Sequence, residues 1–196
     1  MPGTDERPRI VDEKIVHDGF ATITRFVVEA PWRGRTVRLT RDIHYHGHAA
    51  AVLPVDPVRG TGILIRQFRV APFLDGGDGW LWEVPAGLLD GDQPASCAAR
   101  EAQEEAGITV ENIESLGDSL SSPGIVRECV HLFWGTYKTP PPSPVGGLDH
   151  EGEMIEVHEL PMQEVGRLAD TGAIVDSKSA LAVFRLRARR PDLFGE

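Results

Sequence analysis

The spacing of apolar and polar residues predicts a prominent helix near the middle of the chain, over residues 95–106. Asp92 or Gln93 is expected at its N-cap, and Pro94 suits its first turn. Gly107 suits the left-handed position that ends a helix. On a 3.6-residue wheel the alanines share one side and the glutamates share the other. We therefore expect the alanine side to pack on a sheet.

Runs of apolar residues predict strands on both sides of this helix. Residues 10–39 alternate in the manner of an antiparallel meander with a turn at 32–35, which predicts a small N-terminal sheet. Further strands are expected at residues 49–55, 62–68, 80–82, 108–116 and 126–137, and amphipathic helices at 160–172 and 180–189. The order of these elements predicts an α/β fold, an α/β/α sandwich with a mixed sheet.

Three glutamates, Glu101, Glu104 and Glu105, crowd the polar side of the predicted helix. Like charges three and four positions apart destabilise an isolated helix, so a bound cation or a fully solvated surface has to explain them. Hard oxygen ligands beside a turn that offers backbone carbonyls suit Mg²⁺ or Mn²⁺. An exposed acidic face without any ion is the alternative, and the surrounding pattern decides against it.

The segment from Gly87 to Ile108, written G-x5-Q-x6-R-E-A-x-E-E-x-G-I, resembles the Nudix box. The usual form of the box is G-x5-E-x7-R-E-U-x-E-E-x-G-U, where U is aliphatic. The match is specific from Arg100 onward. Upstream the segment is one residue short, and Gln93 stands where the first glutamate is expected.

The resemblance covers roughly residues 10–190 and is closest to the nucleoside-diphosphate-sugar hydrolases of that family. Similar segments are residues 64–71 (LIRQFRVA), 86–90 (AGLLD), 122–124 (SPG), 151–157 and 159–161. They resemble the GDP-mannose hydrolase branch, which has the same shortened box. The neighbouring ADP-ribose diphosphatases share most of these features, and residues 83–87 (EVPAG) are closer to their usual form.

The resemblance implies a Nudix-type fold and a set of functional residues. It implies a catalytic domain at residues 46–196 and an N-terminal β region at residues 1–45, which dimerises and can be exchanged across a homodimer. Implied metal ligands are Ala86, Glu101 and Glu105; implied catalytic residues are Glu153, Glu151 and Glu104; implied substrate-binding residues are Phe20, Arg41, Gln67, Arg69 and Lys178. Glu153 is the favoured general base and Glu151 its rival.

Composition narrows the possible partners. A net charge of −10 argues against a nucleic-acid backbone as the main partner, whereas metal ions allow an acidic protein to bind diphosphates. Two cysteines are too few for a disulfide framework. Neither a signal-peptide pattern nor an apolar run of membrane-spanning length occurs, so we expect a cytoplasmic enzyme that does not bind membranes.

Three histidines, His44, His46 and His48, alternate along one predicted strand and therefore point to the same side. A zinc site is one explanation, but alternating imidazoles seldom converge on one tetrahedral ion without a fourth ligand. We favour the interpretation that these histidines line a solvent-exposed sheet face or the rim of a cleft.

Three functions are compatible with these patterns. The first is Mg²⁺-dependent hydrolysis of GDP-mannose or a similar nucleotide sugar to a nucleoside monophosphate and a sugar 1-phosphate, with Mn²⁺ as a substitute ion. The second is hydrolysis of ADP-ribose to AMP and ribose 5-phosphate. The third is a Nudix-like nucleotide-binding module without catalysis, which the replacement of the first box glutamate by Gln93 supports.

Overall fold

The computed structural model describes residues 7–148 and 152–196, and the chain forms two compact units. The N-terminal unit extends to Gly47 and includes Leu120–Glu128, and the larger unit comprises His48–Ser119 and Cys129–Glu196. The participation of residues 120–128 in the first unit was not expected from the sequence. The predicted roles of residues 1–45 and 46–196 as separate domains stay predictions.

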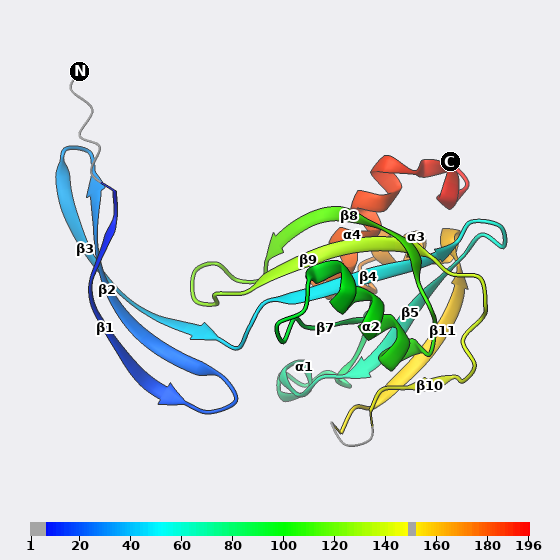
Figure 1. Ribbon diagram of the computed structural model, residues 1–196, viewed down its shortest axis with the longest axis horizontal. Coiled ribbons are helices and arrows are strands. Elements are labelled where there is room, and N and C mark those ends of the chain that lie inside the picture. The colour runs from blue at the N-terminus through cyan, green and yellow to red at the C-terminus, as the bar shows by residue number, and fades with distance from the viewer. Residues whose placement is uncertain (1–6, 149–151) are drawn as a thin grey trace. The chain divides into compact units, whose positions relative to one another are not determined.

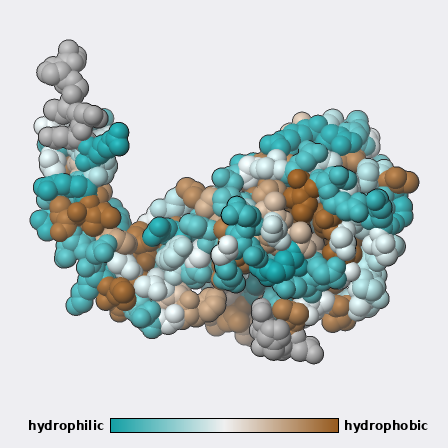
Figure 2. All heavy atoms as spheres, viewed as in Figure 1, coloured by the Kyte–Doolittle hydropathy of each residue, from teal (hydrophilic) through white to brown (hydrophobic). Residues whose placement is uncertain are grey.

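The N-terminal unit contains the expected antiparallel sheet, with strands β1 (Arg9–Asp18), β2 (Thr22–Trp32) and β3 (Arg35–Tyr45) in that order. Arg33 and Gly34 form the β2–β3 turn with φ values of 48° and 76°, as a two-residue hairpin turn requires. Apolar side chains on this unit are exposed (Figure 2), namely Ile10, Ile15, Val16, Phe20 and Trp32.

The larger unit is built on a mixed sheet (Figure 1). Its strands are β4 (Ala49–Asp56), β5 (Thr61–Phe68), β6 (Trp80–Glu83), β7 (Ala86–Leu88), β8 (Glu111–Leu120), β9 (Cys129–Thr136), β10 (Val145–Gly146) and β11 (Ile155–Pro161). The order β10-β11-β5-β4-β9-β8 forms the main path, with β6 paired to β5 and β7 to β4. The β4–β9 pair is parallel and the β4–β5 pair is antiparallel, which confirms the predicted mixed sheet.

Each face of this sheet carries its own hydrophobic core. Along β4, Leu53 and its alternate neighbours pack with α3 (Met162–Asp170) and α4 (Ser177–Arg189), whereas Val52 packs with α2 (Pro94–Ala106) on the opposite face. All eight residues of β4 are buried. Residues 49–55 of the strand are apolar without alternation, as expected for a strand covered on both faces. The resulting helix–sheet–helix layers confirm the predicted α/β/α sandwich.

Helix α2 begins and ends where the sequence predicts. Gln93 occupies the N-cap, although its side chain makes no capping hydrogen bond, and Gly107 adopts the left-handed conformation with φ 67°. The N–H of Gly107 donates to the carbonyl oxygen of Gln103 (3.0 Å), as in an αL C-cap motif. Residues 108–110 connect this capped helix end to the next strand, and β8 begins at Glu111 instead of the predicted residue 108.

The predicted orientation of α2 is partly wrong. Ala95 is exposed, whereas Glu101 and Glu105 belong to the buried side of the helix together with Ala98 and Ala102. Positions 97, 98, 101, 102, 105 and 106 form one stripe of three- and four-residue spacing, and this stripe faces the sheet. Two acidic residues are thus held inside the packing surface.

The described part of the unit also contains two short helices. Helix α1 (Val70–Leu74) follows β5, and a 3₁₀ helix, η2 (Pro191–Phe194), packs Leu193 and Phe194 into the core. Among the helices of the described residues, none is both long enough and apolar enough to cross a membrane.

Candidate active site

The turn that precedes α2 packs directly against the buried acidic residues of that helix. The Ala86 N–H, at the start of β7, donates to Oε2 of Glu105 (2.8 Å). The carboxylate of Glu101 lies so close to the α-carbon of Gly87 that a Cβ at residue 87 would overlap it. A side chain at residue 87 would therefore displace the Glu101 carboxylate from its place against β7.

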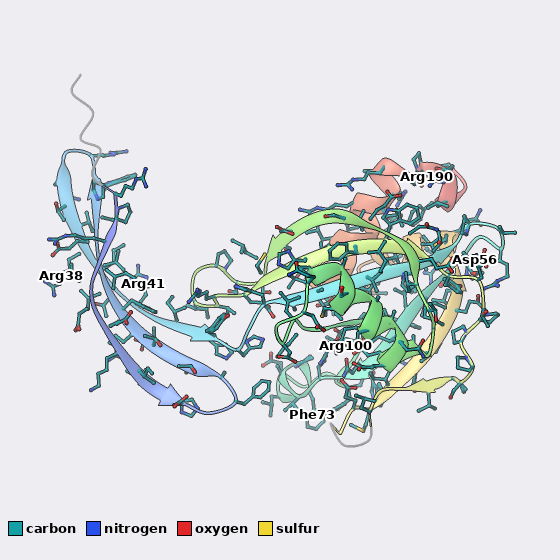
Figure 3. The ribbon with its side chains drawn as sticks, viewed as in Figure 1. Arg38, Arg41, Asp56, Phe73, Arg100 and Arg190 are labelled. Carbon is teal, nitrogen blue, oxygen red and sulfur yellow. The ribbon has the colours of Figure 1, made fainter. Side chains whose placement is uncertain are left out.

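Arg100 connects the loop before α2 with the acidic side of the helix (Figure 3). Its guanidinium donates to Asp92 (3.1 Å), to the Leu88 carbonyl oxygen (3.0 Å) and to Glu104 (2.7 Å). It also lies 2.8 Å from Oε1 of Glu101. One arginine thus compensates part of the negative charge and fixes the loop at residues 88–92.

Burial and mutual repulsion perturb the two inner glutamates. Glu101 is 8% exposed and Glu105 is 2% exposed. Burial raises the pKa of Glu101 to about 7, with Glu104 and Glu153 adding to the rise and Arg100 opposing it. Burial also raises the pKa of Glu105 well above its ordinary value, and the charges of Glu101 and Glu153 add to that rise. Negative charge in this cluster is undercompensated by the protein alone.

The donor set of this cluster fits a hard divalent cation. Carboxylate oxygens of Glu101 and Glu105 and the backbone of Ala86 are ligands that suit Mg²⁺ or Mn²⁺, and a cation would relieve the repulsion described above. The fit rests on the donor chemistry and the charge of these residues.

The loop before β11 brings Glu153 to the same end of α2. Oε2 of Glu153 accepts from the N–H of Leu148 (3.1 Å), and the N–H of Gly147 donates to the Glu104 carbonyl oxygen (3.2 Å). A Cβ at Gly146 would overlap the carbonyl oxygen of Glu105, so this loop is packed tightly on the helix. The rival base, Glu151, lies outside the described residues.

Arg69 and Lys178 meet at a third buried acid, Glu83, at the end of β6. Arg69 donates from Nε and Nη2 to the two carboxylate oxygens (2.7 and 2.9 Å), and Nζ of Lys178 lies 2.5 Å from Oε2. Lys178 also contacts Asp176 (3.0 Å). Burial on its own would raise the pKa of Glu83, but Arg69 and Lys178 outweigh it and lower this pKa to about 2.

The sequence reasoning missed Glu83. A charged residue that ends the apolar run W-L-W-E was the available signal, yet its partners are 14 and 95 residues away along the chain. Arg69 and Lys178, predicted as substrate-binding residues, are thus brought together by a group that the sequence did not single out. Their predicted contact with substrate stays a prediction.

The other predicted binding residues fall in separate places. Gln67, on β5, is 5% exposed, and its Oε1 has no hydrogen-bond partner among the described residues. Arg41 and Phe20 belong to the N-terminal unit (Figure 3 labels Arg41), where Arg41 donates to the Thr40 carbonyl oxygen (2.8 Å) and Phe20 is 90% exposed.

The three alternating histidines do not share one environment. His44 and His46 stack with ring centroids 5.1 Å apart, and His46 pairs with Glu128 (3.3 Å) in the N-terminal unit. His48 belongs to the larger unit, where its Nδ1 accepts from the Cys129 N–H (3.0 Å). Nothing in these contacts supports a zinc site built from the three.

The Glu83 cluster generates a prediction for stability. Because the folded pKa of Glu83 is lowered from 4.5 to about 2, its contribution is fully present above pH 4.5 and is lost as the pH falls towards 2. Glu83→Gln should lower the free energy of unfolding at pH 7 by about 3 kcal/mol, measured by urea denaturation. The difference in free energy of unfolding between this variant and the wild type should decrease steadily as the pH falls below 4.5.

A matched control is Glu164→Gln, which removes an exposed pair with Arg167 on α3. This variant should have nearly the same free energy of unfolding as the wild type, both at pH 7 and below pH 4.5, because solvent screens an exposed ion pair. Equal stability of the Glu83 variant and the wild type at pH 7 would contradict the proposed compensation.

Comparison with known proteins identifies the family. The NUDIX domain model matches residues 45–181. The chain is 36% identical over 174 residues to a GDP-mannose pyrophosphatase of Salmonella arizonae and 36% identical over 174 residues to one of Escherichia coli O1:K1, in each case covering 88% of this chain and 91% of the relative.

A solved structure described as an ADP compounds hydrolase superposes with a TM-score of 0.74 at 19% identity, covering 95% of this chain and 96% of that chain. At this identity the likeness concerns the fold. The domain match, the similarity over most of the chain to these relatives and the shared fold agree, and the chain belongs to the Nudix family.

Proposed function

We propose that the chain hydrolyses the diphosphate bond of a nucleoside diphosphate sugar similar to GDP-mannose, giving a nucleoside monophosphate and a sugar 1-phosphate. The observation that carries the proposal is the pair of buried glutamates, Glu101 and Glu105, held beside Ala86 and Gly87 with Glu153 at the same end of the helix. Relatives named GDP-mannose pyrophosphatase, about 35% identical over most of the chain, support the substrate class.

Mg²⁺ is the proposed cofactor, with Mn²⁺ as a substitute. Ala86, Glu101 and Glu105 would hold it, and it would supply charge neutralisation and orientation of the phosphoryl oxygens. The raised pKa values of Glu101 and Glu105 support this assignment, because a bound cation would stabilise buried carboxylates whose charge the arginines nearby compensate only in part.

The side chains around the cluster have distinct tasks in the proposed reaction. Glu153 would act as general base and take a proton from the attacking water, with Glu151 as the alternative base. Glu104 is the third predicted catalytic residue, and its pairing with Arg100 orients both groups at the edge of the cluster.

Arg69 and Lys178 retain donors for a diphosphate. The bonds to Glu83 use Nε and Nη2 of Arg69, so the Nη1 group can still bind an anion. The ammonium group of Lys178 has three donors, and its contacts with Glu83 and Asp176 occupy two of them. Glu83 thus would position two cations while leaving each able to bind substrate. Gln67 would add a neutral polar contact.

Two alternatives remain distinct from this proposal. Hydrolysis of ADP-ribose to AMP and ribose 5-phosphate uses the same acidic cluster with a different substrate, and residues 83–87 support it. A binding module without catalysis is supported by Gln93, whose side chain is exposed at the N-cap of α2. The cytoplasm is the proposed compartment, consistent with the thiol form of both cysteines.

The proposed activity is tested with a panel of nucleotide sugars and ADP-ribose in the presence of Mg²⁺, with separation of the nucleotide and sugar products. Preferred release of GMP and mannose 1-phosphate supports the proposal. Preferred release of AMP and ribose 5-phosphate favours the second function, and binding without turnover of any compound favours the third.

Glu105→Gln should lower turnover of the preferred substrate at least about a hundredfold, because it removes a charge from the proposed metal site. Steady-state kinetics over a range of Mg²⁺ concentrations checks this, with circular dichroism to verify the fold. Glu114→Gln, at an exposed position on β8, is the matched control and should retain wild-type turnover. Equal turnover of the two variants would remove Glu105 from the metal site.

Glu153→Gln should lower kcat by about 10²–10⁴-fold, the usual contribution of a general base. Glu151→Gln, measured beside it, should have a much smaller effect. If the order of the two effects is reversed, the base is Glu151.

A homodimer that exchanges its N-terminal units is also proposed. The exposed apolar residues of the three-stranded sheet support a partner surface there, and Phe20 and Arg41 would reach the substrate of the other subunit.

Mixing a Glu105→Gln chain with a Phe20→Ala/Arg41→Ala chain tests this directly. A mixed dimer combines an intact catalytic unit with the intact N-terminal unit of the other chain.

After the two inactive variants are unfolded and refolded together, activity should return to about a quarter of the wild-type level, since half of the dimers are mixed and each has one complete site. Each variant refolded alone is the control and should stay inactive. If the mixture is as inactive as its components, each N-terminal unit serves its own subunit or none.

A further inference from the structure

A second cluster of ligand-bearing side chains lies on the outer strands of the larger sheet. Cys129 and His131 belong to β9, and Asp118 belongs to the neighbouring strand β8. One ligand atom from each residue lies within 4.8 Å of the other two, and Nδ1 of His131 is 2.9 Å from Oδ1 of Asp118. None of these residues belongs to the acidic cluster of α2.

The strands place these three side chains on one face. Val130 and Leu132 point into the core under α3 and α4, so the alternate residues Cys129 and His131 point to the opposite face of the sheet. Strict alternation along β8 would turn Asp118 to the same face as Leu116, which lies in the core under α3 and α4.

Gly117 breaks that alternation. Its φ of 92° is a left-handed conformation, as in a β-bulge, and it lets Asp118 turn towards His131. The guanidinium of Arg185 donates to the carbonyl oxygens of Leu116 (3.2 Å) and Asp118 (3.1 Å) and so fixes the backbone on both sides of the glycine. The backbone conformation at Gly117 therefore determines that Asp118 contacts His131.

We propose that Asp118, Cys129 and His131 form a binding site for a transition-metal ion of the zinc class, separate from the Mg²⁺ site proposed for catalysis. A thiolate, an imidazole and a carboxylate are the ligand set of zinc, whereas Mg²⁺ prefers oxygen ligands alone. Two ligands of one tetrahedral zinc ion lie about 3.3–3.8 Å apart, so small side-chain rotations would close the observed spacing.

The site is open to solvent on one side. The side chain of Asp118 is 61% exposed and that of His131 is 25% exposed, so an ion can enter without unfolding the sheet, and water can supply the fourth ligand. Because the ligands come from two neighbouring strands, a bound ion would link β8 to β9. The inference does not depend on the proposed hydrolase activity.

Cobalt(II) is the probe, since a cysteine thiolate bound to it gives a charge-transfer absorption in the near ultraviolet that a carboxylate site does not give. The whole chain, freed of metal by a chelator and kept reduced by a phosphine, is titrated with Co²⁺ and then with Zn²⁺. We expect one equivalent of Co²⁺ to produce this band and Zn²⁺ to abolish it.

Variants assign the band to the three residues. It should be lost in Cys129→Ser and retained in Cys97→Ser, the matched control at the other cysteine, and in Glu105→Gln. Asp118→Asn and His131→Gln should each weaken binding at least about tenfold, since a lost ligand costs no less than a lost outer-shell partner. Circular dichroism verifies that each variant is folded.

Several results would overturn the proposal. They are the absence of a thiolate band in the wild type, its persistence in Cys129→Ser, its loss in Glu105→Gln, and an affinity that the His131 and Asp118 substitutions leave unchanged. If the Glu105 variant no longer hydrolyses substrate but still gives the thiolate band, the catalytic metal site and the site on β8 and β9 are independent, as proposed.

Discussion

The close packing of α2 on the turn before it is the constraint on which the site depends. Gly87 has no side chain where the Glu101 carboxylate lies, and the Ala86 N–H satisfies one oxygen of Glu105. Burying these two carboxylates costs free energy that the Ala86 N–H and the guanidinium of Arg100 offset only in part. The geometry of the turn therefore creates a cluster of charge that an external cation can stabilise.

Glu83 and Glu101 show how the surroundings separate residues of one type. Arg69 and Lys178 both bind Glu83 and lower its pKa to about 2, whereas burial beside other carboxylates raises that of Glu101 to about 7. Glu83 is thus satisfied within the protein and acts as an anchor for two cations. The acidic residues of α2 carry negative charge that the protein itself does not fully compensate, which suits them to bind a metal ion.

Local features of this fold could be predicted from the sequence, and long-range ones could not. The bounds of α2 follow from Pro94 and Gly107, and β4 from its continuous apolar run, because these signals act within a few residues. The face of α2 was partly misjudged, since alanine spacing does not reveal that Glu101 packs against Gly87. The partners of Glu83 are set by tertiary structure alone, as is the meeting of Asp118 with His131.

The same helix that holds the two inner glutamates also positions the loop that carries Glu153. Gly146 passes against the backbone oxygen of Glu105, and Gly147 donates to that of Glu104, so the last turn of α2 serves as the support for this loop. A shift of the helix would move Glu101, Glu105 and Glu153 together. The position of the proposed base relative to the proposed metal ligands therefore depends on the packing of residues 146–148 against the last turn of α2.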